Sequence, residues 1–116
     1  MSSVNKATII GRLGKDPEVK TTSTGKKCAT FSVATSEKYK DKEVTEWHRI
    51  VLWEQLAELA EKYLKKGNLC YLEGKIQTRD YEQNGQKHYI TEIIGSKLTF
   101  LSAKPQESQN REEYPF

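Results

Sequence analysis

One nine-residue stretch, residues 45–53 (TEWHRIVLW), constrains what this chain can fold into more than any other. Side chains alternate between the two faces of a β-strand, so a strand over these residues has two distinct faces. The odd positions share one face and the even positions the other: Trp47, Arg49, Val51 and Trp53 against His48, Ile50 and Leu52. Ile50 and Leu52 suit a hydrophobic core, whereas the indoles and guanidinium form an apolar, positively charged surface with flat faces for stacking. The odd face is therefore the candidate binding surface.

The alternative is that Trp47 and Trp53 are core residues, because large aromatic side chains are mostly buried in folded domains. Two observations oppose it. The even face of the same strand is already apolar, and Arg49 lies between the two indoles. A buried arginine would require a dedicated partner, so the binding interpretation is preferred.

Length and composition indicate one domain with a modest core, since the chain has 116 residues. It is 35% hydrophobic and 30% charged, with a mean hydropathy of −0.79, and these values predict a soluble protein. No apolar run approaches the roughly 20 residues of a membrane span, and the first residues lack the pattern of a signal peptide. We expect a cytoplasmic protein without a membrane partner.

The charge is unevenly distributed along the chain. The net charge is +3, but residues 1–103 carry 17 of the 19 basic side chains and 13 of the 16 acidic ones, a net of +4. A slightly basic body followed by an acidic tip is an asymmetry that accompanies nucleic-acid partners.

The apolar periodicity predicts mainly strands, which we place at residues 4–13, 28–35, 45–53, 68–81, 88–94 and 97–101, with loops at 21–27 and 36–44. Gly74 permits a bend in the fourth strand, and Asn84-Gly85 is a strong hairpin signal.

One helix is expected over residues 54–66, because its apolar residues recur at helical spacing, and Gly67 is its expected C-terminal cap. About five strands with a helix between the third and fourth are the order of an all-β OB-fold, a five-stranded Greek-key barrel. Another small α+β barrel remains an alternative.

Aromatic and basic residues are interleaved over several of these segments. The aromatic residues are Tyr39, Trp47, Trp53 and Tyr81, and the cations among them are Lys38, Lys40, Arg49, Lys75 and Arg79. Lys65 and Lys66, at the C-terminal end of the expected helix, are added to the cations that we expect to contact the nucleic acid. Bases stack on aromatic rings for about 1–3 kcal/mol each, and cations follow the phosphates. The combination predicts sequence-independent binding of single-stranded nucleic acid.

Catalysis is not expected, because the carboxylates are scattered and no glycine-rich phosphate loop is present. Cys28 and Cys70 lie in apolar runs and are predicted to be reduced core residues. Without a Cys-x-x-Cys pair, no metal site or cofactor is predicted. His48, on the core-facing side of its strand, is better explained as a structural or interface residue than as a general base.

Residues 1–103 are predicted to form the domain and residues 104–116 (KPQESQNREEYPF) a disordered acidic tail. The tail ends in Tyr114, Pro115 and Phe116 behind Glu112 and Glu113. A tail that served only solubility would gain nothing from a terminal phenylalanine. Two interpretations, an inert tail and a docking peptide, stay open.

Six segments closely resemble the bacterial-type single-stranded DNA-binding proteins: VNKATIIGRLGKDPEVK, FSVATSEKY, TEWHRIVLW, LAELAEKYLKKG, YLEGKIQTRDY and EEYPF. The resemblance implies a homotetramer of OB-folds that wraps single-stranded DNA in replication, recombination and repair. It places stacking aromatics at Tyr39, Trp47, Trp53 and Tyr81, and a subunit-interface histidine at His48.

The same resemblance implies that the acidic tip recruits replication and repair proteins through Glu112, Glu113, Pro115 and Phe116. The chain departs from the family in its short linker and its less acidic tip, which suit a phage or mobile element as well as a host. Barely ten residues separate Ala103 from the tip, a flexible reach of about 18 Å. A recruited partner must therefore lie close to the DNA-covered body.

Two other functions are compatible with the same barrel. A primosome-type adaptor would act mainly through protein contacts, and would depend on the terminal EEYPF and His48. An OB-fold nuclease would need metal ligands, and the sequence offers no such set.

Overall fold

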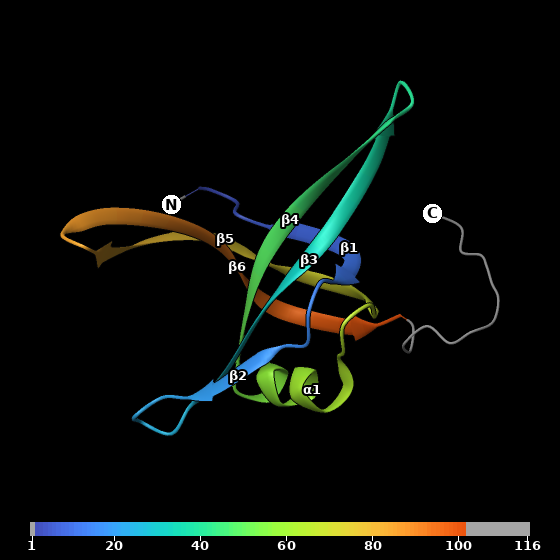
Figure 1. The fold of residues 1–116 in the computed structure, drawn as a ribbon. Helices are drawn as coiled ribbons and strands as arrows, with labels where there is room; N and C mark the ends of the chain where they lie inside the picture. Colours follow the sequence, from blue (N-terminus) through green and yellow to red (C-terminus); the bar gives the residue numbers. More distant parts are fainter. Residues whose placement is uncertain (1, 102–116) are drawn as a thin grey trace.

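The structure is a computed structural model that describes residues 2–101. It contains six strands and one helix (Figure 1), which follow the chain as β1 (Ala7–Leu13), β2 (Glu18–Thr21), β3 (Lys27–Tyr39), β4 (Lys42–Trp53), α1 (Gln55–Tyr63), β5 (Leu69–Gln83) and β6 (Gln86–Phe100). The predicted acidic tail and its tip at residues 112–116 lie outside the described residues, as does the expected domain boundary at residue 103.

The strands form one sheet in the order β1-β5-β6-β4-β3-β2. The sheet closes into a barrel because β1 also pairs with β3, through Arg12 opposite Ala34 and Leu13 opposite Val33. Five strands make the barrel, and the four-residue β2 pairs only with the start of β3. The predicted all-β OB-fold barrel is therefore confirmed. The helix lies between the fourth and fifth strands, and not between the third and fourth, because the short β2 was not predicted.

The core follows the alternation predicted for β4. Ile50 and Leu52 are completely buried, and they belong to one hydrophobic cluster with residues of the other barrel strands. The helix α1 lies against one end of the barrel (Figure 1) and adds Ala57 and Ala60 to this cluster. It therefore closes one end of the core, as expected for its apolar stripe.

The helix is shorter than predicted. It ends at Tyr63, and Leu64 is extended yet buried in the core. Because Leu64 is buried like the apolar residues of the helix, it continues their spacing in the sequence although it lies outside the helix. Gly67 is not the helix cap, because it lies four residues after the last helical residue and donates its backbone N–H to Leu13. Lys65 and Lys66 consequently belong to a turn that is bound to β1.

The prediction of a charged loop over residues 36–44 is wrong. Strands β3 and β4 continue through it as a long hairpin arm, and only Lys40 and Asp41 form the turn. Both turn residues have positive φ, 50° and 67°, as two-residue hairpin turns of this twist require. The turn contains no glycine, which is why the sequence pattern did not reveal it.

The second hairpin, β5–β6, turns at Asn84 and Gly85 as predicted. Its return strand is continuous, whereas the sequence suggested separate strands at 88–94 and 97–101. The strand pairing shifts register between Glu73 and Gly74, which confirms the expected bend. A Cβ at Gly74 would lie 2.2 Å from the carbonyl oxygen of Ile94, so only glycine fits this bulge. Both hairpins project beyond the barrel as arms (Figure 1).

Within residues 2–101, the helix α1 is neither long nor apolar enough to cross a membrane.

Candidate nucleic-acid interface

The odd face of β4 is open to solvent. Trp47 is 55% exposed and Trp53 is 40% exposed, so neither indole is a core residue. Their cross-strand neighbours on β3 are small, Ala34 opposite Trp47 and Cys28 opposite Trp53. Directly opposed residues in an antiparallel pair point to the same face, so these small side chains leave the aromatic rings uncovered. Val51, also on this face, is buried.

A cleft of about 820 Å³ lies beside the Trp47 ring. Its walls are Trp47 and Arg49 of β4, residues 30–32 of β3, residues 14–17 of the segment that joins β1 to β2, and Glu18 at the start of β2. The Trp47 ring lies directly against Gly14, where an added Cβ would come within 2.7 Å of the ring. The lining of the cleft contains the exposed Trp47 ring and the cations Lys15 and Arg49, together with the carboxylates of Asp16 and Glu18. A base can stack on the ring, and either cation can contact a phosphate.

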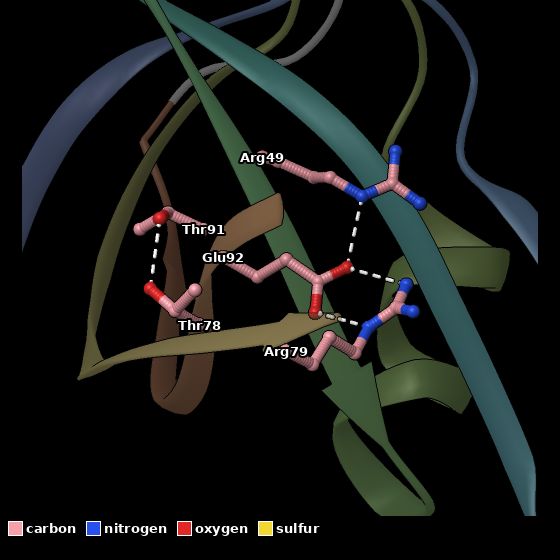
Figure 2. A network of polar contacts seen from close by, with 5 residues as sticks. All are labelled: Arg49, Thr78, Arg79, Thr91 and Glu92. Atoms are coloured by element: carbon pink, nitrogen blue, oxygen red, sulfur yellow. Dashed lines mark hydrogen bonds and ion pairs between the residues drawn. The ribbon is translucent and has the colours of Figure 1, made fainter. Parts of the chain in front are cut away.

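Arg49 and Arg79 share one carboxylate, that of Glu92 (Figure 2). Arg49 Nε donates to Glu92 Oε2 at 2.9 Å. Arg79 donates through Nε to Oε1 at 3.0 Å and through Nη2 to Oε2 at 3.1 Å. The Arg79 contact is therefore bidentate, the strongest geometry for an arginine–carboxylate pair.

Strand register explains this cluster. β4 and β6 pair in parallel with Ile50 beside Ile93, so the preceding residues, Arg49 and Glu92, are also neighbours. On the other side, β5 places Gln77 opposite Glu92, and Arg79 lies two residues along the same face. Long side chains span such diagonal positions. Figure 2 shows the contrast with Thr78 and Thr91, which bond to each other away from the arginines.

The ionisation of Glu92 follows from opposing effects. Burial acts to raise the pKa of its carboxyl group, but hydrogen bonds from Arg79 and Arg49 outweigh burial and the net pKa is lowered. The same hydrogen bond raises the pKa of Arg79. Glu92 is therefore ionised at neutral pH, and because arginine side chains keep their charge in proteins, the cluster carries one net positive charge.

The β5–β6 arm carries the predicted Tyr81. Its ring stacks on His88, with centroids 5.3 Å apart and planes 22° apart. By strand register, Tyr81 and Arg79 share a face, and this face continues to Lys75 at the base of the arm. Lys75 also lines a separate, shallower hollow with Asn5 and Lys6. The arm thus extends the aromatic and basic surface of β4.

The β3–β4 arm carries Tyr39 at its end, where it is well exposed. The Lys40 ammonium lies 5.3 Å from the centre of the Tyr39 ring, in cation–π range. Register places Lys38 on the Trp47 face of the ribbon, and Tyr39 on the opposite face. The structure therefore does not bring Tyr39 into the Trp47 cleft.

The turn after α1 presents Lys65 and Lys66 to solvent. The backbone N–H of Lys66 donates to Asp16, which lines the Trp47 cleft, and that of Lys65 donates to Asn68. The bond to Asp16 holds the backbone of Lys66 beside the cleft, and Lys65 precedes it in the same turn.

His48 is half-buried on the other face of β4, with Nε2 2.8 Å from the hydroxyl oxygen of Thr35. Its role at a subunit interface stays a prediction, as do the DNA contacts assigned to the other predicted residues.

Sequence reasoning missed several residues of this surface. Gly14 and Lys15 were not predicted to belong to the site, since nothing local shows that the segment after β1 folds against Trp47. Glu92 did carry a signal, because it is a lone carboxylate among isoleucines in the run ITEII. A charged residue in such a position indicates a buried ion pair. Within residues 2–101, no group of three or more histidine, cysteine or acidic side chains is placed to hold a metal ion.

Comparison with known proteins identifies the family of this chain. Residues 4–101 match the model of the single-strand binding protein family. The chain is 44% identical to single-stranded DNA-binding protein 1 of Chlorobaculum tepidum, over 126 aligned positions that cover 96% of this chain and 78% of the relative.

A solved structure of the Plasmodium falciparum single-stranded DNA-binding protein in complex with single-stranded DNA superposes with a TM-score of 0.82 at 42% identity. The match covers 88% of this chain and 98% of that one. A matched family model over most of the chain, a close relative and a shared fold lead to one conclusion: this chain belongs to the single-strand binding protein family.

Proposed function

We propose that this protein binds single-stranded DNA independently of sequence, with bases stacked on the exposed aromatic rings and phosphates held by the adjacent cations. The observation that carries this proposal is the solvent-exposed face of β4, where two uncovered indoles flank Arg49. Membership of the family and the similarity to a protein solved with single-stranded DNA support it. Every base has a flat face, so stacking does not select a sequence.

The proposed mechanism is passive. The protein binds unpaired bases and not the duplex, so it removes hairpins by mass action and protects exposed strands during replication, recombination and repair. We propose a homotetramer, in which His48 lies at a subunit interface. The aromatic surface continues from β4 onto the β5–β6 arm, which favours a strand that is wrapped over an extended path.

Titration with poly(dT) tests the proposal. Stacked bases quench tryptophan fluorescence, and both tryptophans of the chain lie on the proposed surface. We expect strong quenching at low salt and an affinity that falls as salt increases, because bound cations release counterions from the strand. No quenching at low salt would reject the proposal. Light scattering of the same sample, alone and with dT oligomers, measures the oligomeric state.

We also propose that the terminal residues, Glu112, Glu113, Tyr114, Pro115 and Phe116, recruit replication and repair proteins. The support is chemical, since two aromatic side chains behind two carboxylates form a peptide with an apolar anchor and an acidic flank. Deletion of Phe116 should abolish capture of such partners and leave poly(dT) affinity unchanged. A variant that loses DNA affinity and retains capture would contradict this division of roles. If DNA binding is weak and is unchanged by Trp47→Ala, the result would instead favour the primosome-type adaptor, which acts mainly through protein contacts.

A further inference from the structure

Glu92 is the one charged side chain among residues 2–101 that is buried, with 3% of its surface exposed. Its two partners are not buried, because the side chains of Arg49 and Arg79 are 42% and 51% exposed. A carboxylate in this position subtracts one charge from a surface that is proposed to bind phosphates. It therefore needs an explanation beyond the packing of β6.

The geometry leaves donors for a ligand. Within the described chain, Arg49 donates to Glu92 only through Nε, so both of its terminal nitrogens remain for another acceptor. Arg79 uses Nε and Nη2, which leaves Nη1. The hydrogen bonds to the carboxylate thus fix the orientation of both guanidinium groups and leave their remaining N–H groups available to a ligand. Fixing long side chains before binding lowers the entropy that binding must supply.

An arriving phosphate does not displace Glu92. If it pulled both arginines away, a carboxylate with almost no solvent contact would be left without partners, which is strongly unfavourable. The phosphate therefore meets the outer edges of the two guanidiniums while the carboxylate remains behind them. Two arginines and one carboxylate then act on the strand as a unit of net charge +1.

We propose that Glu92 is a positioning residue for single-strand binding, which joins Arg49 and Arg79 into one preorganised unit that neutralises one phosphate and not two. The inference rests on the function proposed above and adds the number of phosphates that this part of the surface neutralises.

The salt dependence of binding measures this count directly. For single strands, log K falls with log salt with a slope of about −0.7 for each phosphate neutralised. Glu92→Gln keeps the size and an acceptor oxygen but raises the unit to +2, Arg79→Gln lowers it to 0, and the double variant returns it to +1. Each full chain is titrated with the same dT oligomer, at equal stoichiometry, over a series of salt concentrations.

If Glu92 acts as proposed, the slope follows the net charge of the unit. Per bound subunit, Glu92→Gln is steeper than wild type by about 0.7, which is a further loss of roughly 2.6-fold in affinity between about 50 and 200 mM salt. Arg79→Gln is shallower by a similar amount, and the double variant matches wild type. If Glu92 had a purely structural role, Glu92→Gln would change the stability of the protein, but the salt slopes would not follow the net charge of the unit.

The contrary result is a slope that follows the number of arginines. Glu92→Gln would then equal wild type, and the double variant would equal Arg79→Gln. Circular dichroism and thermal unfolding identify any variant that does not fold. If Glu92→Gln alone fails to fold, the other three proteins decide the matter. A double variant equal to wild type with a shallower Arg79→Gln supports the proposal, and a double variant shallower than wild type, or three equal slopes, overturns it.

Equal slopes in all four proteins would also overturn the inference, since neither arginine would then meet a phosphate. Trp47→Ala separates this outcome from failure of the proposed function. If Trp47→Ala still weakens binding, the stacking surface stands and only the role of Glu92 is wrong.

Discussion

The ring of Trp47 rests on the backbone of Gly14, so closely that a single methyl group at position 14 would lie 2.7 Å and 2.9 Å from two of its ring carbons. The contact joins β4 to the segment between β1 and β2 and forms one wall of the cleft. The six-membered ring of the indole is thereby supported by the backbone at Gly14. Since stacking needs a ring held in place, Gly14 helps to fix the orientation of the residue proposed to stack on DNA.

Gly14→Ala should therefore weaken DNA binding while leaving the fold intact. Gly14 has no positive φ, so alanine is compatible with its backbone, and the exposed ring is free to move aside. A displaced rotamer costs about 0.5–1.5 kcal/mol, which corresponds to a loss of affinity of about 2- to 12-fold. Fluorescence titration with poly(dT) measures it, and the thermal midpoint should change little.

The control for Gly14→Ala is the same substitution in a Trp47→Ala background. Without the ring, the added methyl group has nothing to displace, so the second substitution should cause no further loss. Equal losses in both backgrounds would show that Gly14 acts independently of Trp47.

Tyr81 and Tyr89 provide a matched test of the proposed face on the β5–β6 arm. Both are exposed, at 41% and 69%, but register places Tyr81 on the face of Arg79 and Tyr89 on the opposite face. Tyr81→Ala should lower the affinity for poly(dT) by about 5- to 150-fold if one base stacks on this ring. Tyr89→Ala should have little effect. Equal losses would place DNA on both faces of the arm and contradict the proposed surface.

Local patterns predicted the barrel but not the contacts across it. The alternation in residues 45–53 correctly separated the buried Ile50 and Leu52 from the exposed indoles. Asn84-Gly85 was recognised because its glycine is a known turn signal, whereas Lys40 and Asp41 adopt the same kind of turn without one. The pairing of β3 with β4 on both sides of the turn holds these residues at positive φ, a conformation that Asp adopts more readily than Lys.

The candidate site shows the same limit. The aromatic residues and arginines were identified because residue type alone marks them as able to stack or bind phosphate. Their mutual arrangement depends on the parallel register of β4 with β6 and on the packing of Gly14 against Trp47. Neither contact has a local sequence signature. The pairing of Arg49 with Glu92 joins residues that are 43 positions apart.

The Glu92 cluster also predicts a pH dependence of stability. Because the folded-state pKa of Glu92 is lowered, its contribution is present above the unfolded-state pKa of about 4.3 and is lost as pH falls through the folded-state value. Glu92→Gln should thus be less stable than wild type at pH 7, and the difference should narrow below about pH 4. Urea unfolding at a series of pH values measures it.

Arg79→Gln is the control for this pH dependence. It removes two of the three hydrogen bonds that lower the pKa of Glu92, so its stability should depend less on acid than that of wild type. Glu73, whose pKa is lowered mainly by the hydrogen bond from Tyr71, contributes in the same direction in all three proteins. A gap between wild type and Glu92→Gln that is constant with pH would show that the carboxylate is not held ionised by its partners.

The two cysteines allow the DNA path to be mapped by chemical protection. Cys28 lies directly opposite Trp53 on the proposed surface and is partly exposed, whereas Cys70 is completely buried in the core. Burial raises the pKa of both thiols, that of Cys70 to about 11.

Since the thiolate is the reactive form, we expect a thiol reagent at pH 8 to modify Cys28 slowly and Cys70 only after unfolding. Saturating poly(dT) should slow the reaction of Cys28 further, because a base stacked on Trp53 covers it, and a Cys28→Ser variant assigns the signal. An unchanged rate with DNA bound would exclude Trp53 from the path of the strand.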